Sequence, residues 1–88
     1  MMIKVYFKPT FIKQFKRLES ALQEESFEKI EMFKDKKNHM QLKVHKLNGV
    51  LSGRYSFSVN YKTRIVFSYL SKNEAVLLVI GDHGVYNN

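Results

Sequence analysis

The chain contains no cysteine, and it has only one proline and four glycines among its 88 residues. The absence of cysteine excludes disulfides, thiolate chemistry and cysteine zinc sites. With so few glycines, no glycine-rich phosphate loop precedes a helix. The sequence also lacks an apolar stretch long enough for a membrane span or for the core of a signal peptide. These absences favour a cytoplasmic protein with no membrane partner.

Acidic residues are scarce as well. The sequence has 8 Asp and Glu against 15 Lys and Arg, a formal net charge of +7 at pH 7. A domain this small cannot bury so much charge, so we expect a positive surface that binds nucleic acid or a negatively charged protein. A basic protein without such a partner remains an alternative. The length predicts a single domain over residues 1–88, because half of it would be too small to bury a core.

The first nine residues show the pattern of a strand. Ile3, Val5 and Phe7 alternate with Lys and Tyr neighbours, which predicts a strand with one buried face. Pro9 ends this strand, because proline cannot donate a hydrogen bond to a sheet and is favoured in the first turn of a helix. We therefore expect an N-terminal strand that leads directly into a helix.

The next segment has the apolar spacing of two short helices, over residues 10–18 and 21–35. Ser20 and Gln23 resemble a capping box at the start of the second helix. Two short helices joined by a tight turn should form an antiparallel hairpin. The apolar residues expected on the buried faces are Phe11, Phe15, Leu18, Leu22, Phe27, Ile30 and Phe33.

The second half of the chain reads as a loop followed by strands. Residues 36–52 predict a long loop, with a short edge strand as an alternative. Alternating or continuous apolar runs then predict strands over residues 55–59, 64–70 and 75–80, joined by two polar turns. The expected fold is α+β, with the N-terminal strand, the helical hairpin and a three-stranded antiparallel meander packed in two layers. One face of the sheet should be partly open and carry the polar positions.

The side chains that could carry chemistry form a metal-free set. The three histidines are far apart in the sequence, and the acidic residues gather mainly in the second predicted helix, as on a solvated face. The remaining candidates are His45, Arg54, Arg64, His83 and Tyr86. Histidine can act as acid or base near neutral pH, the arginine fork matches two phosphate oxygens, and tyrosine can stack on a base or donate a proton. Such a set can cleave RNA without a metal ion.

Each of these residues also has a structural alternative. A histidine after a strand is often a turn residue, and a tyrosine near a C-terminus often only packs. Arg64 can be solvated or ion-paired, and His45 can satisfy loop backbone groups. Sheet geometry nevertheless favours a common site, because Arg64 begins the hairpin partner of the strand that His83 follows, which places both residues at one end of the sheet.

Four stretches carry a resemblance to a known family. They are His45-Lys46-Leu47-Asn48-Gly49, Gly53-Arg54-Tyr55-Ser56-Phe57-Ser58-Val59, Arg64-Ile65-Val66-Phe67 and Ile80-Gly81-Asp82-His83-Gly84-Val85-Tyr86. With them the chain resembles the RelE/ParE superfamily, and in particular the RelE/StbE-type toxins of type II toxin–antitoxin pairs. The order of the expected elements and the length also fit, so the resemblance covers essentially the whole chain.

The resemblance implies a ribosome-dependent mRNA endonuclease that needs no cofactor. Arg64 is similar to the arginine that stabilises the phosphate, His83 to a catalytic residue after the last strand, Tyr86 to the C-terminal aromatic, and His45 to a loop histidine of some members. The lysines and arginine expected to contact nucleic acid are Lys43, Lys46, Arg54 and Lys62. The implied partners are mRNA on the ribosome, a small cognate antitoxin, and operator DNA reached only through the antitoxin complex.

Two serines depart from the pattern of the active ribonucleases, which often have basic residues on the outward face of the second strand. Here those positions hold Ser56 and Ser58. The superfamily also contains inhibitors of DNA gyrase, so a gyrase inhibitor and an inactive antitoxin-binding member remain alternatives. In each case the antitoxin should be acidic at the contact, partly disordered when free, and bound at the open sheet face or at the groove of the helical hairpin.

Overall fold

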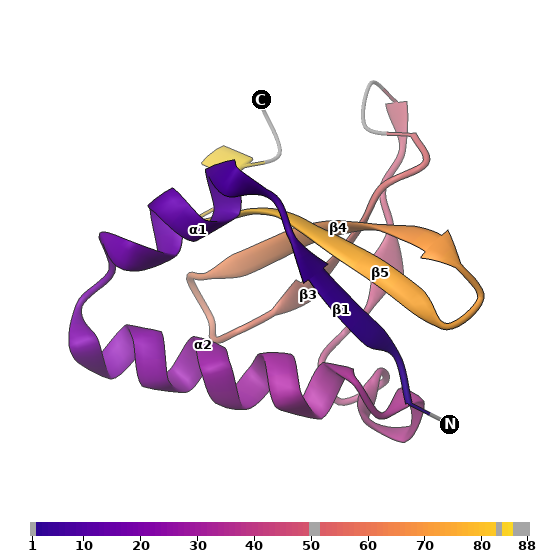
Figure 1. Cartoon of the computed structure of the whole chain (residues 1–88), viewed down its shortest axis with the longest axis horizontal. Helices are drawn as coiled ribbons and strands as arrows, with labels where there is room; N and C mark the ends of the chain where they lie inside the picture. Colours follow the sequence, from indigo (N-terminus) through magenta and orange to yellow (C-terminus); the bar gives the residue numbers. More distant parts are fainter. Residues whose placement is uncertain (1, 50–51, 83, 86–88) are drawn as a thin grey trace.

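Five strands form one sheet, and two helices pack against one of its faces (Figure 1). The structure is a computed structural model that describes residues 2–49, 52–82 and 84–85. The elements are β1 (Lys4–Phe7), α1 (Pro9–Lys16), α2 (Ser20–Phe33), the 3-10 helix η1 (Lys36–Asn38), β2 (His45–Lys46), β3 (Tyr55–Ser58), β4 (Arg64–Ser71) and β5 (Glu74–Gly81). No helix in this described part of the chain is long and apolar enough to cross a membrane.

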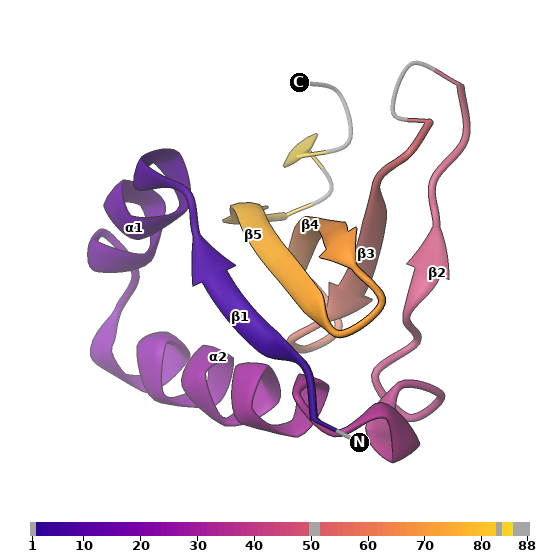
Figure 2. The same cartoon turned by 45° about the vertical axis from the view of Figure 1, so that its right-hand side comes forward.

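The strand order across the sheet is β1-β5-β4-β3-β2. β1 runs parallel to β5, and the other neighbours are antiparallel. Figure 2 shows β1 and β2 at opposite edges, with the predicted meander of β3, β4 and β5 between them. The α+β class and the three-stranded meander are confirmed, and the short edge strand considered for residues 36–52 is β2.

The core between helices and sheet is built around aromatic rings. Phe33 of α2 is fully buried, and its ring centroid lies 4.6 Å from that of Phe57 and 4.7 Å from that of Phe67. Phe11 of α1 is buried against the same cluster. Aromatic pairs at these separations add about 0.5–1.5 kcal/mol each beyond the burial of their area. Phe33 therefore joins the helical layer to the middle of the sheet.

The prediction that Phe27 is buried is wrong, since its side chain is 59% exposed. The buried residues of α2 are Ser26, Ile30 and Phe33, which follow the i, i+4, i+7 spacing of one helical stripe. Phe27 lies one residue further round the helix, so it faces the space between α1 and α2. Phe7, expected on the buried face of the first strand, is likewise 45% exposed and borders that space.

The predicted capping box at the start of α2 is also wrong. Glu19 is the residue before the helix, and its side chain makes no capping hydrogen bond, while Ser20 is the first helical residue. The side-chain amide of Gln23 instead donates to the carbonyls of Phe15 and Lys16, at 3.0 and 3.4 Å. Gln23 thus satisfies carbonyls at the end of α1, which have no partner within that helix.

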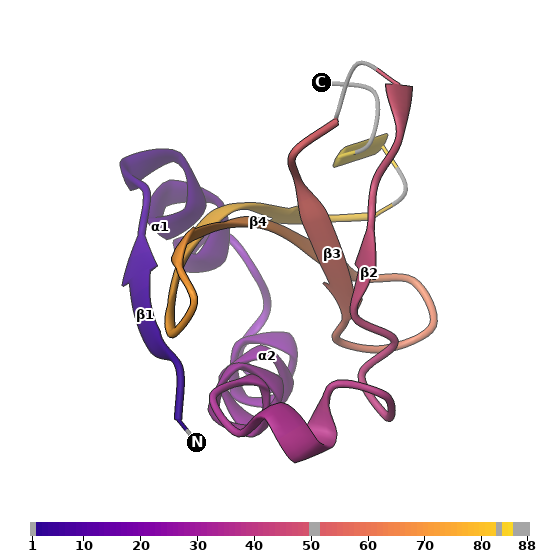
Figure 3. The same cartoon turned by 90° about the vertical axis from the view of Figure 1, so that its right-hand side faces the viewer.

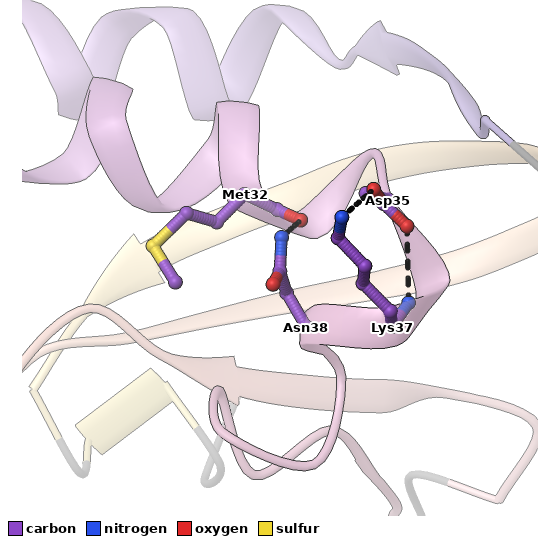
Figure 4. A network of polar contacts seen from close by, with 4 residues as sticks. All are labelled: Met32, Asp35, Lys37 and Asn38. Carbon is purple, nitrogen blue, oxygen red and sulfur yellow. Dashed lines mark hydrogen bonds and ion pairs between the residues drawn. The ribbon is translucent and has the colours of Figure 1, made fainter.

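The end of α2 is fixed by a polar network (Figure 4). The Asn38 amide donates to the carbonyl of Met32 at 2.9 Å, and the Lys37 backbone N–H donates to the Asp35 carboxylate at 3.1 Å. The Lys37 N–H, helped by the charge of the Lys37 side chain, lowers the pKa of Asp35 below its ordinary value of 3.8. The network therefore stabilises the fold above that value and weakens as the pH falls and the carboxylate protonates.

Candidate functional site

Strand register gathers several predicted residues on the face of the sheet opposite to the helices, here called the outer face. Its residues alternate with the core residues along the strands. They are His45, Ser56, Ser58, Arg64, Val66 and Gly81, which follow from the pairs His45–Ser56, Ser56–Val66, Ser58–Arg64 and Arg64–Gly81. His45 and Arg64 lie two strands apart, roughly 10 Å across the sheet. The common site predicted from the sequence joined Arg64 to His83, and of these two only Arg64 is among the described residues.

Arg64 is held by the turn that precedes it. Its Nη1 donates to the carbonyls of Asn60, Tyr61 and Thr63, at 2.6, 3.0 and 3.3 Å. No hydrogen bond from Nη2 or Nε, and no ion pair of Arg64, is found in the described part of the chain. The guanidinium is therefore anchored by one nitrogen, and its other donors remain for a phosphate.

The anchor depends on Asn60, which the sequence analysis did not single out. The Asn60 side-chain oxygen accepts from the backbone N–H groups of Lys62 and Thr63, both at 2.9 Å, and its amide donates to Glu25 of α2 at 2.8 Å. These bonds shape the turn whose carbonyls hold Arg64. An Asn opening a four-residue polar turn before a strand is the signal that could have found it, because Asn side chains commonly bond the backbone two residues on.

His45 lies on edge strand β2 and is exposed. Its Nδ1 is 2.8 Å from the carbonyl oxygen of Lys43, and its Nε2 is 3.4 Å from the Ser56 hydroxyl. The carbonyl can only accept, so this contact favours the neutral tautomer with the proton on Nδ1, in which Nε2 is an acceptor. His39, which was not a candidate, is used structurally, because its Nε2 donates to the carbonyl of Phe33 at 2.7 Å and its ring stacks on that residue.

His83 and Tyr86 lie outside the described residues. The segment that leads to His83 is described: β5 ends at Gly81, the partner of Arg64, and Asp82 follows in a bend. The Asp82 carboxylate accepts from the backbone N–H of Gly84 at 2.9 Å, and its carbonyl accepts from Val85 at 3.1 Å. Figure 3 shows residues 84–85, drawn in yellow, on the opposite side of the sheet from α2, which is the side of the outer face.

The basic candidates are exposed but do not all lie together. Lys62 lies in the turn before Arg64, and Lys43 precedes β2. Lys46 pairs with Tyr55, a core-side residue, so the register places it on the face opposite to His45. Arg54 lies just before β3, and its carbonyl accepts from Leu47. The structure therefore brings Lys62 close to Arg64 and separates Lys46 from that end of the outer face.

The centre of the outer face is less open than the sequence predicted. Ser56 and Val66 are fully buried there, and Val85 in the turn after β5 is buried too. The polar face expected from the alternation of residues 55–59 therefore does not lie free in solvent at its middle. The exposed groups of the site, such as His45, lie around that buried centre.

The acidic residues of the chain are concentrated in and around α2. Residues 19–35, which include α2, hold six of the eight acidic residues of the chain and only two of its 15 basic residues. The remaining residues are therefore strongly basic, and the outer face lies on that side, away from α2. Among the described residues, no group of three His, Asp or Glu side chains could hold a metal ion.

Gly81 is the residue that allows the turn after β5 to fold back. A Cβ placed on it would lie 2.8 Å from Cγ1 of Val85, closer than packed carbons allow. We expect Gly81→Ala to lower stability by about 1–3 kcal/mol, as overpacking does, and to displace the segment that carries His83. Thermal unfolding measures the first effect. The double variant Gly81→Ala/Val85→Ala removes the clash. Its loss of stability should therefore be smaller than the sum of the losses in the two single variants, whereas equal values would contradict this contact.

Comparison with known proteins shows which solved structures share this fold. No protein-family model and no curated protein matches the chain. Solved structures match over nearly its whole length. The archaeal RelE–RelB complex from Pyrococcus horikoshii OT3 contains a chain with a TM-score of 0.73 and 17% identity, covering 96% of this chain and 98% of that one.

Two further matches give the same result. The toxin–antitoxin complex RelBE2 from Mycobacterium tuberculosis has a TM-score of 0.70 and 14% identity, covering 94% of this chain and 100% of that chain. YafQ from E. coli has a TM-score of 0.70 and 12% identity, covering 98% and 99% of the two chains. The resemblance to the RelE/ParE superfamily is thus confirmed as a shared fold.

Proposed function

We propose that this protein is the toxin of a toxin–antitoxin pair and that it cleaves mRNA on the ribosome without a metal ion. The observation that carries the proposal is the pairing of Arg64 with Gly81, two residues before His83, on the same outer face as His45. The RelE-like fold and the concentration of positive charge outside α2 support it. A basic surface attracts the phosphate backbone of RNA whatever the nucleotide sequence, and so favours association with ribosome-bound RNA.

The chemistry follows from the groups on that face. A base removes the proton of a 2′-hydroxyl, and the oxygen attacks the adjacent phosphorus. The bond from phosphorus to the 5′-oxygen breaks, and an acid protonates that oxygen. The products are a 2′,3′-cyclic phosphate and a 5′-hydroxyl. The donors of Arg64 that the turn leaves available would stabilise the charge that develops on the phosphate.

Expression in a bacterial host tests this function. Induction should arrest growth, and primer extension on a translated transcript should show cuts within the reading frame that disappear in the His83→Ala variant. Growth arrest with intact transcripts and an induced SOS response would favour a gyrase inhibitor instead. The absence of growth arrest would favour an inactive, antitoxin-binding protein. Ser56 and Ser58 are the reason for this second candidate, because neither side chain can supply the charge of a basic residue.

The antitoxin has a candidate binding groove between α1 and α2. Its volume is about 460 Å³, and apolar side chains from β1 and both helices line it, including Phe7, Ile12 and Phe27. Lys16 borders it on α1 and Glu31 on α2. An amphipathic helix of the antitoxin would bury its apolar stripe there. The acidic contact expected from the net charge suits Lys16 on the α1 side, whereas Glu31 on the α2 side already pairs with Lys34 at 2.7 Å.

Phe27 should dominate this contact. We expect Phe27→Ser to weaken binding of the antitoxin encoded beside this gene by about tenfold or more, since a central aromatic commonly carries 1.4 kcal/mol or more of binding energy. Leu70→Ser is the matched control, because Leu70 is 58% exposed on β4, outside the groove. Titration calorimetry compares the two variants. Equal weakening, or weakening only by Leu70→Ser, would place the antitoxin elsewhere.

A further inference from the structure

The chain bends sharply just before β2, at a residue with an unusual conformation. Lys43 has a φ of 58°, and it is the only residue other than glycine with positive φ among the described residues. The left-handed region is unfavourable for a side chain with a Cβ, and glycine is the residue usually found there. The surrounding structure must therefore impose this conformation on Lys43.

Two backbone hydrogen bonds impose it. The N–H of Val44 donates to the carbonyl of His39 at 3.0 Å, and the N–H of Lys43 donates to the carbonyl of Met40 at 3.1 Å. This pair of bonds, six-to-one and five-to-two in spacing, is the Schellman motif that ends a helical turn, with Lys43 at the left-handed position. The turn itself follows η1, which the network of Figure 4 ties to α2.

The motif also fixes the direction of one carbonyl. In a trans peptide the C=O and the following N–H point in opposite directions within one plane. Since the Val44 N–H points at His39, the Lys43 carbonyl must point away from it, and there it accepts from Nδ1 of His45 at 2.8 Å. The proton of the neutral imidazole is thereby held on Nδ1.

We propose that Lys43 is a positioning residue whose backbone carbonyl holds His45 in the Nδ1–H tautomer and so presents Nε2 as the proton acceptor of the site. This inference rests on the proposed function for the identity of the proton, which is that of a 2′-hydroxyl. The Ser56 hydroxyl now reaches Nε2 at 3.4 Å, which is long for a hydrogen bond. In the proposed reaction a substrate 2′-hydroxyl would be the group that gives its proton to Nε2.

This role is separate from any contact of the Lys43 side chain with RNA. The carbonyl belongs to the backbone, so it persists when the side chain is removed, provided that residue 43 keeps its conformation. Glycine adopts the left-handed region freely, whereas a β-branched residue does so only with strain. Lys43→Gly and Lys43→Val remove the same positive charge and differ in the conformation they favour.

The test has a spectroscopic and a kinetic part. Long-range proton–nitrogen NMR on the purified chain, at a pH where the ring is neutral, should show His45 protonated at Nδ1 in the wild type and in Lys43→Gly. In Lys43→Val the Nε2–H tautomer should appear. Lys43→Gly should also raise the melting temperature, by about 4 °C.

Cleavage of ribosome-bound mRNA supplies the kinetic part. The Lys43→Gly variant should cleave faster than the Lys43→Val variant. The cleavage rate of the His45→Ala variant should be lower than that of the wild type by about 10²-fold or more, as expected for loss of a general base. An Nε2–H tautomer in the wild type, or equal cleavage by the two Lys43 variants, would overturn the proposal. If the wild type cleaves nothing, the proposed function fails, and the NMR result alone still decides whether Lys43 holds the tautomer.

Discussion

Arg64→Ala is expected to lower mRNA cleavage by about 10²–10³-fold, the loss typical of removing one donor that stabilises transition-state charge. Arg64 lies on the outer face between Ser58 and Gly81, and Nη1 is anchored to the turn carbonyls. Because the anchor orients the guanidinium before substrate binds, its Nη2 and Nε donors are available without reorganisation. Primer extension on ribosome-bound mRNA, with purified protein, gives the rate.

The same substitution also costs stability, and the two effects must be separated. Loss of the bonds to the carbonyls of Asn60, Tyr61 and Thr63 should destabilise the fold by about 1–2 kcal/mol, so rates are compared well below the unfolding transition. Arg64→Lys keeps the charge but not the fork, and should recover only part of the activity. Arg17→Ala, an exposed arginine after α1, is the control for lost charge. Cleavage by Arg64→Ala within threefold of that control would reduce Arg64 to a structural residue of the turn.

Phe33→Ala is expected to destabilise the protein by about 3–5 kcal/mol, the usual cost of removing a buried aromatic side chain. The ring of Phe33 contacts Phe57, Phe67 and His39, with centroids 4.6 to 4.8 Å apart. A domain of this size is commonly stable by only about 5–10 kcal/mol, so much of the margin would be lost. Urea unfolding, followed by circular dichroism, measures the change.

Phe27→Ala is the matched control for Phe33→Ala, since both residues lie on α2. Phe27 is 59% exposed and outside the buried core, so its truncation should change the free energy of unfolding by no more than about 0.5 kcal/mol. Similar losses at the two positions would contradict the orientation of α2. A loss only at Phe27 would mean that the helix is rotated about its axis.

The strands of the second half could be predicted from the sequence because their patterns are local. Alternation in β3 and β4 predicts which of their residues face the core, the apolar run of β5 predicts a central strand, and polar turns between them favour hairpins. The end-to-end pairing of Arg64 with the segment before His83 followed from that hairpin. Neighbouring residues alone determine such features, so one sequence is enough to predict them.

The features that could not be predicted depend on contacts between distant residues. Phe27 and Phe33 are both apolar residues of the same predicted helix. Which of them is buried depends on the rotation of α2 about its own axis relative to the sheet. The bond of Gln23 to the end of α1 and that of Asn60 to Glu25 join elements whose relative placement is tertiary. The parallel pairing of β1 with β5 likewise joins residues about 70 positions apart.

The candidate site likewise has features that the sequence predicts and features that it does not. The residue types were evident from the sequence, but the bonds that orient them were not. The left-handed Lys43 is an example, because a lysine side chain disfavours this backbone conformation and only the surrounding hydrogen bonds impose it. Orientation decides which nitrogen of His45 can accept a proton and which edge of Arg64 can meet a phosphate.

The most direct measurement of the proposed activity uses purified protein, ribosomes and a defined mRNA, with analysis of the fragment ends. The proposed function predicts cuts that depend on the ribosome. Attack by a 2′-hydroxyl predicts an upstream fragment ending in a 2′,3′-cyclic phosphate and a downstream fragment with a 5′-hydroxyl. His45→Ala and Arg64→Ala should remove these cuts. Intact mRNA on the ribosome, or fragments with a 5′-phosphate, would contradict the proposed reaction.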